Sequence, residues 1–125
     1  MKKILFFLSL VLTLTVFPVS AQNWYYVGQS PNDEQVFINN SAVMKNDVQA
    51  VVAIKTNPSR SGRKIDPDCQ YDITIYTITR NYYYSIDGVY LYNDSQKLIR
   101  RQDKATAQKP IPAGSMLEKI YQMVW

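Results

Sequence analysis

Cys69 carries the most reactive side-chain chemistry of this chain, because the sequence has one Cys and no His. The absence of His excludes the Ser-His-Asp and Cys-His nucleophile systems and removes the commonest metal ligand. A single Cys excludes a Cys cluster for a metal and a disulfide within the chain. A reactive thiol needs a nearby cation, whereas the neighbours here are Asp68 and Asp72. We therefore expect a buried, inert thiol at the start of a strand, with an intermolecular disulfide as the alternative.

Carboxylates gather beside this cysteine, with Asp66 and Asp68 two residues apart and Asp72 four residues further on. Acid–base catalysis by two carboxylates requires them to face each other in a cleft. Carboxyls in a Pro-containing loop and at a strand start are usually solvated instead. We predict that the chain is not an enzyme and has no catalytic, metal-binding or cofactor-binding residues.

Cationic residues form two clusters that are candidates for binding a partner. The clusters are Arg60, Arg63 and Lys64 in one segment, and Arg100, Arg101 and Lys104 in the other. Either cluster could hold a sulfated glycan, an acidic protein or phosphate. The alternative is that both are solvated loops.

Tyrosines are the other candidate contact residues, because Tyr is amphipathic and loses little side-chain entropy at an interface. The run from Tyr82 to Tyr84, together with Tyr90 and Tyr92, would place aromatic rings on both faces of a hairpin. We take Tyr82 and Tyr84 as partner-binding candidates. Cross-strand packing explains the inward-facing rings equally well.

Residues 1–21 have the pattern of a secretory signal peptide. Lys2 and Lys3 precede an apolar run over residues 4–17, and small residues end at Ala21, which predicts cleavage after Ala21. The alternative is a transmembrane anchor, but the run is shorter than the roughly 20 residues that span a bilayer. No Cys follows the run, so the signal is not that of a lipoprotein. We expect an exported protein, either periplasmic or secreted.

Cleavage would leave one domain, residues 22–125. Removing 21 of the 125 residues leaves 104, and removing Lys2 and Lys3 lowers the formal net charge from +4 to +2. This length suits a single domain with a small core. So small a positive charge, together with export, argues against a nucleic-acid partner.

The elements of this domain follow from hydrophobic periodicity and turn residues. β-rich runs cover residues 23–28, 35–38, 48–56, 69–80 and 97–100. Residues 48–56 are apolar on both alternating sets of positions, which favours a central strand. Asp87 and Gly88 separate two further β-rich runs, which predicts a hairpin turn. Residues 57–67 are typical of a loop.

The C-terminal segment changes to a helical period. Ser115 and Glu118 have the spacing of a capping box, and apolar residues follow from Leu117 at i, i+3, i+4 and i+7. So short a helix is marginal alone in water and has to pack on the sheet. The sequence predicts an α+β fold, an antiparallel β-sheet of about five or six strands with one C-terminal helix packed on it.

Several segments in a fixed order carry a family resemblance: NWYYVG, VFINNSAVMKNDVQAVVAIK, the pair Asp68 and Cys69, YYSIDGVYLY, and PIPAGSMLEKIYQMV. Together they resemble the surface-adhesin protein E family of Gram-negative bacteria, over nearly all of residues 22–125. The resemblance implies a small exported domain with an antiparallel sheet and a C-terminal helix. The founding member is an outer-membrane adhesin that binds host extracellular-matrix proteins.

This chain departs from that family in two respects. The founding adhesin is a lipoprotein, whereas this signal lacks the lipidation Cys. Family members often carry a second Cys near the end of the helix, which the resemblance implies as a partner for Cys69, but this chain ends in Met123, Val124 and Trp125. We expect a non-enzymatic, adhesin-E-like binding protein for an extracellular or envelope protein or glycan. The alternative is a structural or assembly protein of the bacterial envelope that acts as a homodimer.

Overall fold

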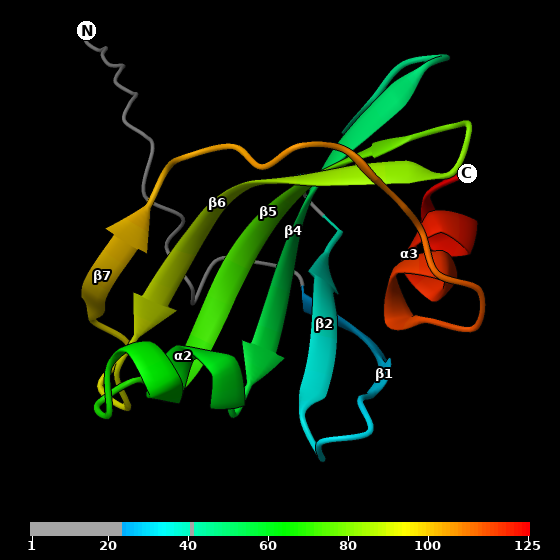
Figure 1. Ribbon diagram of the computed structural model, residues 1–125. Coiled ribbons are helices and arrows are strands. Elements are labelled where there is room, and N and C mark those ends of the chain that lie inside the picture. Colours follow the sequence, from blue (N-terminus) through cyan, green and yellow to red (C-terminus); the bar gives the residue numbers. More distant parts are fainter. Residues whose placement is uncertain (1–23, 41) are drawn as a thin grey trace, which may run out of the picture.

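A computed structural model describes residues 24–40 and 42–125 of the chain (Figure 1). The predicted signal peptide, with its cleavage site after Ala21, lies outside these residues. Within the described ranges, no helix is both long enough and apolar enough to cross a membrane.

The described chain is built around one antiparallel sheet of eight strands (Figure 1). The strands are β1 (Trp24–Gln29), β2 (Gln35–Asn39), β3 (Met44–Lys45), β4 (Gln49–Asn57), β5 (Tyr71–Thr79), β6 (Tyr83–Tyr92), β7 (Leu98–Gln102) and β8 (Lys109–Pro110). The described residues also contain the helices α2 (Arg60–Ile65) and α3 (Met116–Val124). The predicted α+β class, an antiparallel sheet with a C-terminal helix, is confirmed.

The strand order is β1-β2-β4-β5-β6-β7, with β3 paired to β4 and β8 paired to β6. β4 lies inside the sheet, and its alternate residues are buried on both faces. Val52 and Ile54 belong to the core on one face, whereas Ala53 belongs to a second cluster on the other. The central position predicted for residues 48–56 is therefore confirmed.

Helix α3 begins at Ser115 as predicted, because the Ser115 Oγ accepts a hydrogen bond from the Glu118 N–H at 3.2 Å. The return contact differs from the predicted capping box. The Glu118 carboxylate accepts from the Gly114 N–H at 2.8 Å, so it caps the turn before the helix. Ile120 and Val124 are buried on the sheet, which gives this short helix its stability.

The main core lies between α3 and one face of the sheet. Its buried members are Val27, Val36, Ile38, Ala50, Val52, Ile54, Ile78, Ile111, Ile120 and Val124. Helix α2 covers another part of the same face, where Gly62 packs against the Leu91 side chain. We call this surface the helix face.

The opposite face carries a second apolar cluster. Ala53, Tyr71, Ile73 and Tyr92 are buried in it, and the Tyr71 and Tyr92 rings stack at 5.0 Å between centroids. Neither helix contributes a residue to this cluster. We call this surface the aromatic face and define it by the rings of Trp24, Phe37, Tyr71, Tyr90 and Tyr92.

The prediction of a hairpin turn at Asp87 and Gly88 is wrong. β6 runs through both residues, with a bulge opposite Ile75 and Tyr76 of β5. The chain reverses directly before β6 instead, where Tyr82 has a φ of 73°. Gly88 serves close packing, because a Cβ there would lie 3.0 Å from the Tyr90 ring.

Three short elements are not predicted by the sequence pattern. β3 and β8 have two residues each, which is too few for an alternating pattern to register. Helix α2 occupies most of the predicted loop over residues 57–67, which corrects that prediction. The strand count rises above the expected five or six because of β3 and β8.

Candidate functional site

Helix α2 forms because Ser59 caps it and a buried carboxylate fixes the cap. The Ser59 Oγ accepts from the Gly62 N–H at 3.0 Å and donates to the Asp72 carboxylate of β5 at 2.5 Å. Gly62 brings the helix backbone close to the sheet, since a Cβ there would lie 2.6 Å from the Cys69 Sγ. A six-residue helix has little stability alone, so these contacts to the sheet hold it in place.

Helix α2 and strand β7, which carry five of the six predicted cations, lie on the same side of the molecule (Figure 1). Ile65 at the end of α2 and the arginines Arg100 and Arg101 of β7 line a common hollow of about 230 Å³. Val89 and Leu91 complete its apolar part. We call α2, β7 and the hollow between them the basic edge. Arg100 and Arg101 line the hollow, whereas Arg60, Arg63 and Lys64 lie on α2 beside it. Lys104 is exposed after β7 and does not line the hollow.

The two arginines of α2 are partly used to hold neighbouring loops. The Arg60 Nε donates to the Asn32 carbonyl at 2.5 Å. The Arg63 guanidinium donates to the Cys69 carbonyl and to the Gln70 side chain, both at 3.0 Å. Lys64 and Arg100, by contrast, are exposed and have no polar partner among the described residues. These two side chains are therefore the cations most available to a ligand.

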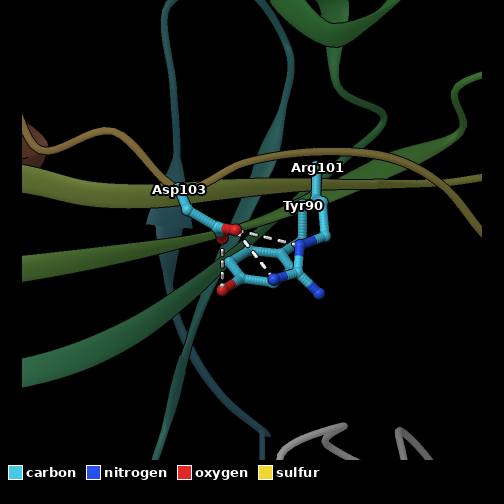
Figure 2. A network of polar contacts seen from close by, with 3 residues as sticks. All are labelled: Tyr90, Arg101 and Asp103. Carbon is cyan, nitrogen blue, oxygen red and sulfur yellow. Dashed lines mark hydrogen bonds and ion pairs between the residues drawn. The ribbon is translucent and has the colours of Figure 1, made fainter.

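Arg101 belongs to a small polar network (Figure 2). Its guanidinium donates to the Asp103 carboxylate at 2.7 and 3.0 Å, and the Tyr90 hydroxyl donates to the other oxygen of that carboxylate at 3.1 Å. The hydrogen bond from Arg101 holds the pKa of Asp103 below its ordinary value. This ion pair is solvent-exposed, so it orders the start of the following loop with little effect on stability.

Tyr82 and Tyr84 do not lie at the basic edge. The Tyr82 side chain is 40% exposed, and its ring lies 4.2 Å from that of Tyr121 in α3. Tyr84 is half-buried and packs beside Tyr76 against the core beneath α3. Figure 1 places α3 and β7 at opposite sides of the sheet. Tyr84 thus follows the alternative of internal packing.

Cys69 is a free thiol that is 1% exposed, which confirms the interpretation as a buried thiol. Its Sγ donates to the Tyr71 carbonyl at 3.4 Å. Burial, together with the nearby Asp72 charge, raises the pKa of this thiol. The reactive thiolate is therefore disfavoured.

Asp72 is buried, which corrects the expectation that the carboxyls beside Cys69 are solvated. It is 7% exposed and accepts from Ser59 and from Thr74, the latter at 2.9 Å, at the wall of a hollow of about 350 Å³ beneath α2. Asp66 and Asp68 lie apart from it in a local turn, where the Asp68 N–H donates to the Asp66 carboxylate at 3.0 Å. The described residues contain no group of three or more potential metal ligands of the His, Cys, Asp and Glu types.

Asp72 should make stability fall as pH rises. Burial raises its pKa above the ordinary 3.8 in the folded protein, so the folded chain keeps the proton to a higher pH than the unfolded chain. The contribution of Asp72 to the free energy of unfolding is full below its pKa in the unfolded chain. This contribution declines as the pH rises from that pKa to the pKa of Asp72 in the folded chain. Each pKa unit between those values corresponds to about 1.4 kcal/mol. Asp72→Asn removes this titration, so urea unfolding from about pH 3.5 to pH 7 should show a smaller decline in the variant. An identical pH profile in both proteins would contradict this role.

The fold and this site define a small α+β protein with an antiparallel sheet, a C-terminal helix and a hollow lined by two arginines of β7. Comparison with protein-family models, with curated proteins and with solved structures finds no match. The resemblance to the surface-adhesin protein E family therefore stays a prediction.

Proposed function

We propose that this chain is an exported, non-enzymatic binding protein whose basic edge contacts an acidic macromolecule of the cell envelope or extracellular matrix. The observation that carries the proposal is that Ile65 of α2 and the arginines Arg100 and Arg101 of β7 line one hollow, although the two basic segments are far apart in the sequence. Sulfated glycans are the ligand class to test first, because they present repeated anions to such a surface.

The composition of the basic edge supports this role. Lys64 and Arg100 are exposed, and Ile65 is 53% exposed beside them. Cations set around an exposed aliphatic side chain can neutralise sulfates while the aliphatic group covers the sugar ring. The arginines that hold loops, Arg60 and Arg63, keep the cations of α2 in a fixed arrangement.

The two other residues with potentially reactive side chains, Cys69 and Asp72, support a binding function over a catalytic one. The Cys69 thiol is buried with a raised pKa, which opposes nucleophilic attack. The Asp72 oxygens accept hydrogen bonds from Ser59 and Thr74, and these contacts hold α2 to the sheet. Both residues therefore have structural roles.

Lys64→Gln combined with Arg100→Gln should weaken heparin binding by residues 22–125 about tenfold at 0.15 M salt. The plot of log affinity against log salt should also become less steep by about two, since each lost cation releases about one counterion fewer. Isothermal titration or heparin-column elution measures both quantities.

The matched control is Lys109→Gln combined with Lys119→Gln, which removes the same charge from exposed residues outside the basic edge. This control should keep most of the affinity. Equal losses in the two double variants would show that heparin senses only net charge. That result, or no heparin binding at low salt, would refute the basic edge as the binding site.

A further inference from the structure

Lys55 lies at the centre of a group of aromatic rings on the aromatic face. Its Nζ is 4.6 Å from the centroid of the Tyr71 ring, 5.7 Å from that of Trp24 and 5.9 Å from that of Phe37. The strand register accounts for this position, because Lys55 of β4 is directly opposite Phe37 of β2 and Ile73 of β5. The rings stabilise the ammonium through cation–π contacts but offer it no hydrogen-bond acceptor.

Hydrogen-bond donors around this lysine also lack acceptors. The Trp24 Nε1 and the Tyr71 hydroxyl are buried without a hydrogen-bond partner, and Tyr71 is only 3% exposed. Lys55 has ring contacts but neither an ion pair nor a hydrogen bond among the described residues. Buried polar groups are nearly always paired in folded proteins, and leaving them unpaired is costly. Lys55 and two of the aromatic residues that it contacts thus each have a donor without an acceptor among the described residues.

The other end of the same face shows what a completed arrangement looks like. There Arg101 and Tyr90 share the Asp103 carboxylate, so both donors have an acceptor (Figure 2). At the Lys55 end, the neighbouring carboxylate on β5 is that of Asp72, which faces α2 on the opposite side of the sheet. Among the described residues, the aromatic face has a carboxylate at the Arg101 end, and Lys55 at the other end has none as a partner.

The surroundings of these donors are apolar. Ala53 and Ile73 are buried in the cluster, and Ile75 and Leu98 pack against it. A ligand seated here would contact aliphatic and aromatic surface except at its anionic group. This combination favours an anion attached to an apolar body over a small, fully hydrated ion.

We propose that the Lys55 end of the aromatic face binds a carboxylate carried on an apolar body, with Lys55, Trp24 and Tyr71 donating to its oxygens. This site is separate from the basic edge and does not depend on it. Burial lowers the pKa of Lys55, and a bound carboxylate would reverse part of that effect by stabilising the ammonium.

Octanoate is a suitable probe, because it is a carboxylate on a short apolar chain. The chain has two tryptophans, and Trp125→Phe assigns their indole N–H signals in a ¹H–¹⁵N NMR spectrum of residues 22–125. Octanoate should shift the Trp24 signal in a saturable way. Octanamide, which has the same body without the charge, should bind at least tenfold more weakly.

Lys55→Met should weaken octanoate binding about tenfold while keeping the length of the side chain. Lys45→Met is the matched control, because the Lys45 ammonium also lies over a tryptophan ring, 5.5 Å from the centroid of Trp125. Tyr71→Phe keeps the ring beneath Lys55 and should weaken binding about threefold by removing one donor. Tyr71→Phe and octanamide keep the test decisive if Lys55→Met does not fold.

No saturable shift of Trp24, or equal affinity for octanoate and octanamide, would overturn this proposal. Undiminished octanoate binding by folded Lys55→Met would do the same. The variants of the basic edge should bind octanoate normally, and Lys55→Met should bind heparin normally. The failure of one proposal is therefore distinguishable from the failure of the other.

Discussion

Gly62→Ala should lower the free energy of unfolding by about 2 kcal/mol, because the added methyl group has no room. A Cβ at this position would lie 2.6 Å from the Cys69 Sγ and 2.7 Å from the Ser59 Oγ. Both atoms are held in place, Ser59 by its contacts to α2 and Asp72, and Cys69 by its burial. Urea denaturation followed by circular dichroism measures the loss.

The matched control for Gly62→Ala is Ser61→Ala, the preceding and exposed residue of α2. It should change stability by less than about 0.5 kcal/mol. Because α2 presents Lys64, Gly62→Ala should also weaken heparin binding under conditions where the protein stays folded. Wild-type stability of Gly62→Ala would mean that α2 is not packed as described.

Ile120→Ala should lower the free energy of unfolding by about 3 kcal/mol, the range found for large aliphatic side chains removed from a core. Ile120 is 1% exposed and is the most deeply buried residue of α3. It packs in the cluster that includes Val52 and Ile78 of the sheet. The same urea experiment applies.

Gln122→Ala is the control for Ile120→Ala, since Gln122 is exposed on the same helix and alanine preserves helix propensity. It should leave stability nearly unchanged. Similar small effects of both substitutions would indicate that α3 contributes little to folding, contrary to its burial in the core.

Predictions that rest on a helix-capping residue or on the periodicity of apolar residues agree well with the structure. Ser115 starts α3 because its hydroxyl accepts from the Glu118 N–H, a contact between residues three apart. The doubly apolar pattern around Val52 and Ala53 correctly indicates a strand that is buried on both faces. In each case the deciding interaction is encoded within a few residues.

Predictions fail where a distant contact decides the local conformation. Asp87 and Gly88 have the composition of a hairpin turn, but pairing with β5 keeps the strand continuous and accommodates the extra residue as a bulge. The segment before Asp66 has loop composition, yet Asp72 and a close sheet contact at Gly62 fold it into α2. Neither contact is visible in the local sequence.

The candidate sites show the same division. The two basic clusters are evident in the sequence, but the hollow shared by α2 and β7 follows from β7 pairing with β6 beside α2. The surroundings of Lys55 are harder to foresee, because their rings come from β1, β2 and β5. Lys55 is the single Lys in the apolar strand predicted over residues 48–56, and this isolated charge is a sequence signal that could have marked the position.

β7 is one terminal strand of the sheet order, and its position bears on solubility. An open sheet edge is a template on which a second chain can add a strand and begin aggregation. On β7, two copies meeting edge to edge would bring the exposed Arg100 of each copy close together, whereas Arg101 is paired with Asp103. The resulting repulsion disfavours self-association through β7 and keeps this edge free at high protein concentration.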